Sequence, residues 1–149
     1  MYSYTIYCAL FICCAQVFSI KIPDALYDQH TLECMEKTNI DKAFIEKSFD
    51  EKFHVVKGDA KVNEYLSCLG KTKGLINDDG KLNPTLIYDT NMNIINILVE
   101  KNEDKHDLAT EVTDECINST GDNYGDMIAN LHDCVVDAFA KHNVTIFPN

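Results

Sequence analysis

Cysteine is the side chain in this sequence with the most evident chemistry, because a thiol can form a disulfide, bind a metal ion or act as a nucleophile. The first three of the seven cysteines fall within residues 1–19, which carry no charge and contain an apolar run from Ala9 to Ala15. The segment's total of about 14 apolar residues is too few to span a bilayer, but the segment suits a secretory signal. We therefore interpret residues 1–19 as a signal peptide and residues 20–149 as one secreted, extracellular domain.

The domain at residues 20–149 keeps four cysteines, an even number, and in an oxidising compartment this predicts two structural disulfides. Spacing alone leaves all three pairings open. No CxxC or HxxxH spacing supports a metal site, and an even count leaves no thiol free for catalysis. Each bridge should stabilise the fold by about 3–4 kcal/mol if it acts through chain entropy. The four cysteines are Cys34, Cys68, Cys116 and Cys134.

Other patterns that could support catalysis are weak. The five histidines accompany no GxSxG, HExxH or phosphate-binding-loop motif, so we expect no enzymatic activity, no cofactor and no metal. Residues 77–80 (NDDG) begin like a calcium loop, but the bidentate acid expected at its twelfth position is absent. Asn118 and Asn143 each begin an N-glycosylation sequon, whose occupancy the sequence leaves open.

The charge balance excludes several classes of partner. The chain has 13 lysines, no arginine and 24 acidic residues, for a net charge of −11. Nucleic-acid binding needs a basic surface, usually rich in arginine, so we expect none. Hydrophobic residues make up 46% and charged residues 25% of the chain, which is typical of a folded domain. No later apolar segment is long enough to cross a membrane, so we expect no membrane insertion after signal cleavage.

Apolar residues recur at helical spacing through most of residues 20–149, and no strand-like alternation bounded by hairpin turns occurs. The expected fold class is therefore all-α, with about six short helices. Residues 92–101 favour a helix and leave a strand as the alternative. Capping residues and proline place the helix starts. The predicted helices follow Asp24, Asp41 and Asp59, begin near Pro84, cover residues 104–118, and follow Asp122 or Asn123.

The segment YLSCLGKTKGLINDDGKL, which contains Cys68, resembles insect odorant-binding proteins of the pheromone-binding/general-odorant-binding family. Most members have six cysteines, with the second four positions before the third and the fifth nine positions before the sixth. Here those two positions hold Glu64 and Gly125. Both halves of one family bridge are thus absent, as in the four-cysteine C-minus subgroup.

The resemblance implies the disulfide pairing, because the family joins its first cysteine to its third and its fourth to its sixth. Carried over, these are Cys34–Cys68 and Cys116–Cys134. Where the third and last helices meet, we expect them to be held by packing alone. Such a core should be more mobile than that of a three-bridge relative and should accept a wider range of ligand shapes.

The resemblance also implies a function: a compact helical bundle that encloses an apolar cavity and carries small hydrophobic ligands such as odorants or pheromones. The same resemblance makes a chemosensory receptor or a second copy of the chain a candidate partner. Tyr65 could supply the hydroxyl that orients a polar ligand group. The expected ligand-binding residues come from the apolar helical stripes and the C-terminal tail: Tyr65, Leu66, Leu69, Leu98, Val112, Ile128, Leu131, Val135 and Phe147.

Three alternatives stay open. The tail that contains Phe147 either packs on the surface or covers the cavity as a lid. Protonation of His132 and His142 could loosen that tail, although exposed histidines without such coupling are more frequent.

A secreted four-helix signalling protein would also be all-α with two disulfides, but its helices should be longer, about 20 residues or more, and its core solid.

Overall fold

The computed structural model describes residues 20–99 and 104–144, and the segment interpreted as a signal peptide lies outside them. Within the described residues the chain forms helices and no strand, which confirms the all-α fold class. The only β-type pairings there are single bridges, between Phe49 and Val55 and between Ile76 and Leu82. The elements are η1 Asp24–Leu26, α1 Gln29–Thr38, α2 Lys42–Lys47, α3 Ala60–Thr72, α4 Pro84–Leu98, α5 Lys105–Cys116 and α6 Tyr124–Lys141.

Each α-helix begins at an Asp or Asn whose side chain accepts hydrogen bonds from the first-turn backbone N–H groups. The predicted caps Asp41 and Asp59 are confirmed, and of the two candidates for the last helix Asn123 is the cap. The first helix differs from the prediction. Residues after Asp24 form only a short 3-10 turn, and α1 begins at Asp28, whose carboxylate accepts from the backbone N–H of Thr31 at 2.8 Å.

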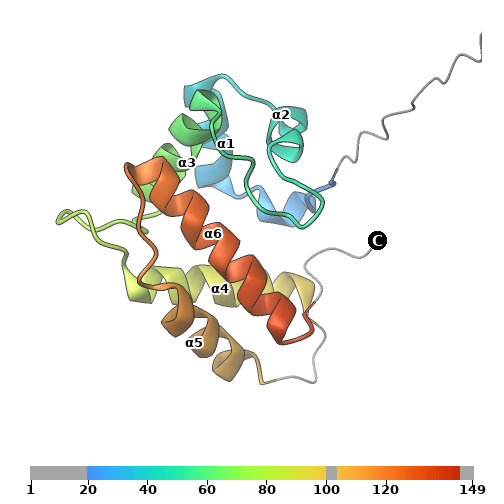
Figure 1. Cartoon of the computed structure of the whole chain (residues 1–149). Helices are drawn as coiled ribbons and strands as arrows, with labels where there is room; N and C mark the ends of the chain where they lie inside the picture. Colours follow the sequence, from blue (N-terminus) through green and yellow to red (C-terminus); the bar gives the residue numbers. More distant parts are fainter. Residues whose placement is uncertain (1–19, 100–103, 145–149) are drawn as a thin grey trace, which may run out of the picture.

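The helices pack around α6, which crosses the front of the molecule in Figure 1 with α4 passing behind it. The most extensive helix–helix contact is between α3 and α6, and α4 packs mainly on α5. Residues 92–98 belong to α4. For these residues the predicted helix is therefore confirmed, and the alternative prediction of a strand is wrong. Ile95, Val112 and Phe139, from α4, α5 and α6, are almost completely buried in the core.

Two disulfides brace this arrangement. Cys34–Cys68 joins α1 to α3, and Cys116–Cys134 joins the end of α5 to α6, with Cα atoms 5.7 Å apart in each pair. The pairing implied by the family resemblance is therefore confirmed.

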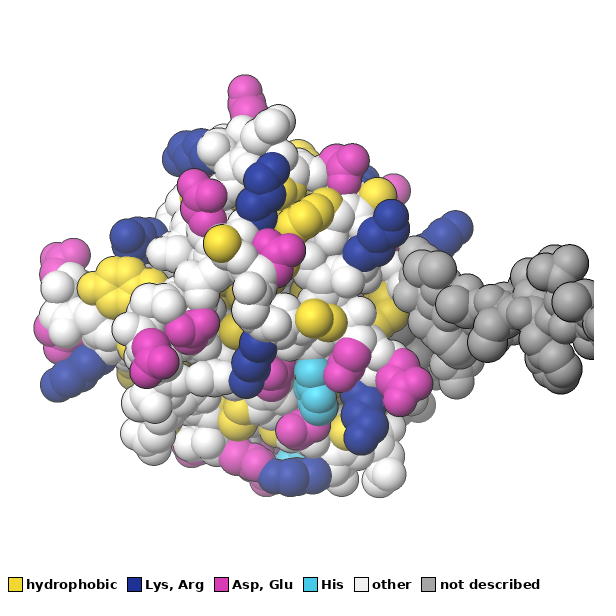
Figure 2. Space-filling view, turned by 45° about the horizontal axis from the view of Figure 1, so that its top comes forward, with side chains coloured by type: hydrophobic (Ala, Val, Ile, Leu, Met, Phe, Trp, Pro, Cys, Tyr) yellow, Lys and Arg dark blue, Asp and Glu magenta, His cyan; other side chains and the backbone are white. Residues whose placement is uncertain are grey.

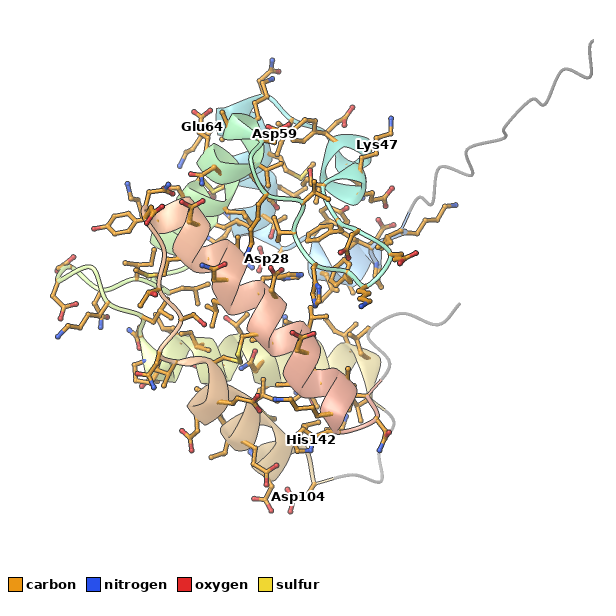
Figure 3. The ribbon with its side chains drawn as sticks, in the orientation of Figure 1. Asp28, Lys47, Asp59, Glu64, Asp104 and His142 are labelled. Atoms are coloured by element: carbon orange, nitrogen blue, oxygen red, sulfur yellow. A yellow bond between two sulfur atoms is a disulfide. The ribbon has the colours of Figure 1, made fainter. Side chains whose placement is uncertain are left out.

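The backbones of α3 and α6 come into close contact at Gly125. A Cβ atom at Gly125 would lie 2.3 Å from the carbonyl oxygen of Asn63. Glu64 is exposed on the outer side of α3 (Figure 3). The expectation that packing alone holds this junction is wrong, because Asn63 Nδ2 donates a hydrogen bond to Asp126 Oδ1 at 2.7 Å.

The surface is mixed in character. On the face in Figure 2, hydrophobic side chains form small separate groups between lysines and acidic residues. Leu32, Val56 and Tyr124 are the large hydrophobic residues exposed among the described ones. In the same part of the chain, no helix combines the length and the apolar character that crossing a membrane requires.

Candidate functional site

A cavity of about 230 Å³, partly open to the surface, lies among the helices. Its wall comes mainly from the N-terminal segment, the loop between α2 and α3, and helices α3, α4 and α6, with single residues from α1 and α2 and two from the segment after α3. Most of the wall is aliphatic or aromatic, so the cavity is suited to an apolar guest. The hydrophobic part of the wall consists of Ile22, Leu26, Tyr27, Ile45, Phe49, Phe53, Tyr65, Leu66, Leu69, Leu75, Ile87, Ile94, Ile128, Leu131, Val135, Val136 and Phe139.

Six of the nine residues expected at the ligand site lie on this wall, and α3 and α6 bring them together. Val112 is instead buried within the core, and Leu98 ends α4 away from the cavity wall. Phe147 and the proposed lid fall outside the described residues. That the six bind a ligand stays a prediction. They are Tyr65, Leu66, Leu69, Ile128, Leu131 and Val135.

The sequence analysis missed the part of the wall that comes from non-helical segments. Phe49 and Phe53 lie in the loop after α2, and their ring centroids are 4.4 Å apart. Loop residues have no helical period, so pattern analysis could not assign them to the interior. Ile22, before the first helix, was missed for the same reason, whereas Leu26 fell in the helix predicted after Asp24 but was not among the residues expected at the ligand site. The only available signal was the number of large apolar side chains in these short segments.

His132 connects this aromatic loop to α6. Its Nε2 atom lies 2.9 Å from the backbone carbonyl oxygen of Phe53. Because a carbonyl oxygen only accepts, Nε2 carries a proton and donates it, as it does in one of the two neutral forms of the ring. The ring also contacts Phe49 and Phe53, at centroid distances of 5.1 and 5.0 Å. Beside it, Asp133 Oδ1 accepts from the backbone N–H of Val55 at 2.8 Å. These contacts hold the loop against α6 and thereby close one side of the cavity.

Burial lowers the pKa of His132 below its ordinary value of 6.5, although the Phe53 carbonyl and Asp133 act in the opposite direction and His54 adds to the lowering. The folded state therefore favours the neutral ring. Below pH 6.5 the unfolded chain binds a proton that the folded chain does not, so protonation favours unfolding. Stability associated with His132 is thus complete above pH 6.5 and declines as the pH falls toward the lowered folded value.

We accordingly expect His132→Gln to reduce the loss of stability between pH 7 and pH 5. Urea denaturation at both pH values measures this difference, with His30→Gln, which alters an exposed position in α1, as the matched control. An unchanged pH dependence in the His132 variant, with both proteins folded, would contradict the expectation.

The opposite end of the wall is polar. Lys73 Nζ donates to Asp28 Oδ2 at 2.6 Å, and the Thr31 hydroxyl donates to Asp28 Oδ1 at 2.8 Å. Burial alone would raise the pKa of Asp28, but the hydrogen bonds from Lys73 and Thr31 outweigh it and lower the pKa. The carboxylate is therefore charged and paired where α1 begins and α3 ends.

A second polar contact lies between α4 and α5. Asn91, also on the cavity wall, donates from Nδ2 to the Thr113 hydroxyl at 3.0 Å. Thr113 in turn donates to the carbonyl oxygen of Ala109 at 2.7 Å. Both side chains are buried. Their hydrogen bond matters for stability, because a buried polar group without a partner would destabilise the fold.

Among residues 20–99 and 104–144, no group of three or more His, Cys, Asp or Glu side chains is placed to hold a metal ion. All four cysteines of this region are in disulfides. The cavity can bind a ligand by removing the ligand's apolar surface from water.

Comparison with known proteins gave one match. The model of the PBP/GOBP family matches residues 24–138. Neither the search of curated proteins nor the search of solved structures gave a significant match. The matched region begins at η1 and ends within α6, so it contains every residue of the cavity wall except Ile22 and Phe139.

Proposed function

This chain belongs to the PBP/GOBP family, and from that premise we propose that it is a secreted carrier that binds small hydrophobic ligands in its internal cavity. Odorants, pheromones and similar semi-volatile molecules are the ligand class that the family membership favours. Carriage requires no reaction, and we propose that the chain is not an enzyme. The two disulfides agree with a secreted protein, because such bridges persist in oxidising compartments.

The cavity is the observation that supports this proposal. Apolar cavities of about 150 Å³ stay dry and bind molecules of the size of benzene. The cavity here, of about 230 Å³, has room for a somewhat larger guest. Burial yields about 25 cal/mol for each Å² of apolar surface. After the cost of association, we expect dissociation constants in the range of about 1 μM.

The signalling alternative is not favoured. Its helices should reach about 20 residues or more, whereas α6, the longest described helix, has 18 residues and the others have 6 to 15. A hollow interior also differs from the solid core that a protein acting only through its surface needs.

Titration with the fluorescent apolar probe N-phenyl-1-naphthylamine tests the proposal. We expect saturable fluorescence enhancement with one probe per chain and a dissociation constant of about 1 μM. Protein unfolded in guanidinium is the control and should give no enhancement. Folded protein that takes up no probe, and that carries no small molecule in native mass spectrometry, would contradict the carrier function.

A further inference from the structure

We propose that Asn118 is an N-glycosylation site and that the secreted protein carries an oligosaccharide on the side-chain nitrogen of Asn118. This inference rests on the secretion included in the proposed function, because N-linked glycans are attached in the secretory pathway. It goes beyond that function by assigning a covalent modification to the segment between α5 and α6. The acceptor motif is Asn118-Ser119-Thr120.

The two side chains of this motif that a glycosyltransferase must reach, Asn118 and Thr120, are both exposed. Neither side chain makes a hydrogen bond to the described residues, whereas the backbone around them is fixed. The Ser119 N–H donates to the carbonyl oxygen of Cys116 at 3.0 Å, and Asn130 Nδ2 donates to the carbonyl oxygen of Thr120 at 2.6 Å. A glycan on Asn118 therefore breaks no hydrogen bond of the described fold.

The chain has two other Asn-x-Thr sequences, and in both of them the structure explains the asparagine without a glycan. Asn83 is followed by proline, which excludes it as an acceptor, and its side chain caps α4. Asn143 follows the end of α6 in the left-handed conformation, with a φ of 57°, which asparagine adopts more readily than most residues. Asn118 has no positive φ and caps none of the described helices. The fold thus gives no structural reason for an asparagine at position 118.

The surroundings of Asn118 suit a sugar and lie away from the ligand cavity. In Figure 1 the segment that contains Asn118 connects α5 to the start of α6, and neither α5 nor this segment contributes to the described cavity wall. A groove with mainly polar side chains lies beside the motif, and it is lined by Lys57, Thr120, Gly121, Asp122, Asp126 and Asn130. An oligosaccharide attached at Asn118 therefore begins on polar surface, where sugar hydroxyls find hydrogen-bond donors and acceptors, and leaves the cavity wall uncovered.

The disulfide next to the motif does not prevent the modification. Cys116 lies shortly before Asn118, and its partner Cys134 comes later in the chain, in α6. Because a chain is synthesised and delivered N-terminus first, Asn118 reaches the glycosylating enzyme before Cys134 does. The bridge between α5 and α6 cannot yet have formed at that moment, so the motif is still open.

The attachment is a group transfer whose co-reactant is a lipid-linked oligosaccharide pyrophosphate, which the secretory pathway supplies. The side-chain nitrogen of Asn118 forms a bond to the anomeric carbon of the first sugar. The bond between that carbon and the pyrophosphate oxygen breaks, and the lipid pyrophosphate leaves with the electron pair. One proton of the amide passes to a base of the transferase.

Secretion of the full chain from cultured insect cells, followed by mass spectrometry, tests the site. Tryptic peptides are treated with peptide N-glycosidase A in water enriched in heavy oxygen, which converts a glycosylated asparagine to labelled aspartate and so locates the sugar. Asn118→Gln and Thr120→Val each destroy the motif, whereas Thr120→Ser keeps the hydroxyl. Asn143→Asp is the matched control, because it removes the other open motif and tolerates the left-handed conformation.

We expect the wild-type protein and the Thr120→Ser and Asn143→Asp variants to be heavier than the polypeptide by one oligosaccharide or more, with the label at residue 118. Asn118→Gln and Thr120→Val should lose the modification at that position. Secreted wild-type protein with a bare Asn118, or with sugar only on Asn143, would overturn the inference. Binding of N-phenyl-1-naphthylamine by that protein would show that the carrier function stands without it. A wild-type chain retained in the cells with residues 1–19 still attached would contradict both the secretion and the inference.

Discussion

Leu131→Trp is expected to abolish most ligand binding while leaving the protein folded. Leu131 lies in α6, is 6% exposed, and forms part of the cavity wall. The larger indole would extend into the 230 Å³ cavity and occupy space that a ligand needs. If about 100 Å² of apolar contact is lost, then at about 25 cal/mol per Å² the affinity falls by about 2.5 kcal/mol, or close to a hundredfold.

Probe titration and displacement measure this loss, and circular dichroism verifies that the helices persist. Leu32→Trp is the matched control, because Leu32 is an exposed leucine in α1 outside the cavity wall. The control should bind the probe like the wild-type protein. A folded Leu131 variant with unchanged probe affinity would show that the ligand site lies elsewhere.

Removal of either disulfide is expected to cause the largest loss of stability. Cys34 and Cys68 are 34 residues apart, and Cys116 and Cys134 are 18 apart. With these loop sizes, the chain-entropy relation gives about 4 kcal/mol for the first bridge and about 3 kcal/mol for the second. Each is a large fraction of the stability of a typical domain, which is about 5–15 kcal/mol.

Urea denaturation of the Cys34→Ala/Cys68→Ala and Cys116→Ala/Cys134→Ala variants measures these losses. The matched control is Lys37→Ala/Lys61→Ala, which places two exposed substitutions in the same helices as the first bridge, α1 and α3. This control should change the free energy of unfolding by less than about 0.5 kcal/mol. Disulfide variants as stable as the wild-type protein would contradict the account of how the bundle is braced.

Most of the helices could be predicted because local chemistry determines where they begin, whereas the disulfide pairing followed from the family resemblance and not from the spacing of the cysteines. Asp41 and Asp59 cap their helices through their own side chains, whatever lies across the fold. The first helix shows the limit of such reasoning. Asp24, the predicted cap, instead pairs with Lys42, whereas Asp28 caps α1 and also pairs with Lys73, 45 residues away in the sequence. The hydrogen bond between Asn63 and Asp126 was unpredictable for the same reason, since it depends on how α3 and α6 meet.

The candidate site could be predicted only where helices form it. The apolar stripes of α3 and α6 identified Tyr65 and Leu131, both on the wall. The same kind of stripe also identified Val112, which lies in the solid core, because periodicity distinguishes the interior from the surface but not a wall from a filled core. Phe53 lies in a loop, so no periodic pattern assigned it to the interior, and Tyr27 lies in the segment after Asp24 that was predicted to be helical but precedes α1.

Crystallography of the full chain with 1-bromooctane tests the central claim most directly, because bromine gives an anomalous signal that locates the guest. The cavity between α3, α4 and α6 should contain one bromine peak, next to Leu131 and Val135 on the wall. A crystal structure with side chains filling that space, or with bromine bound only at the surface at saturating concentration, would contradict the proposed carrier function.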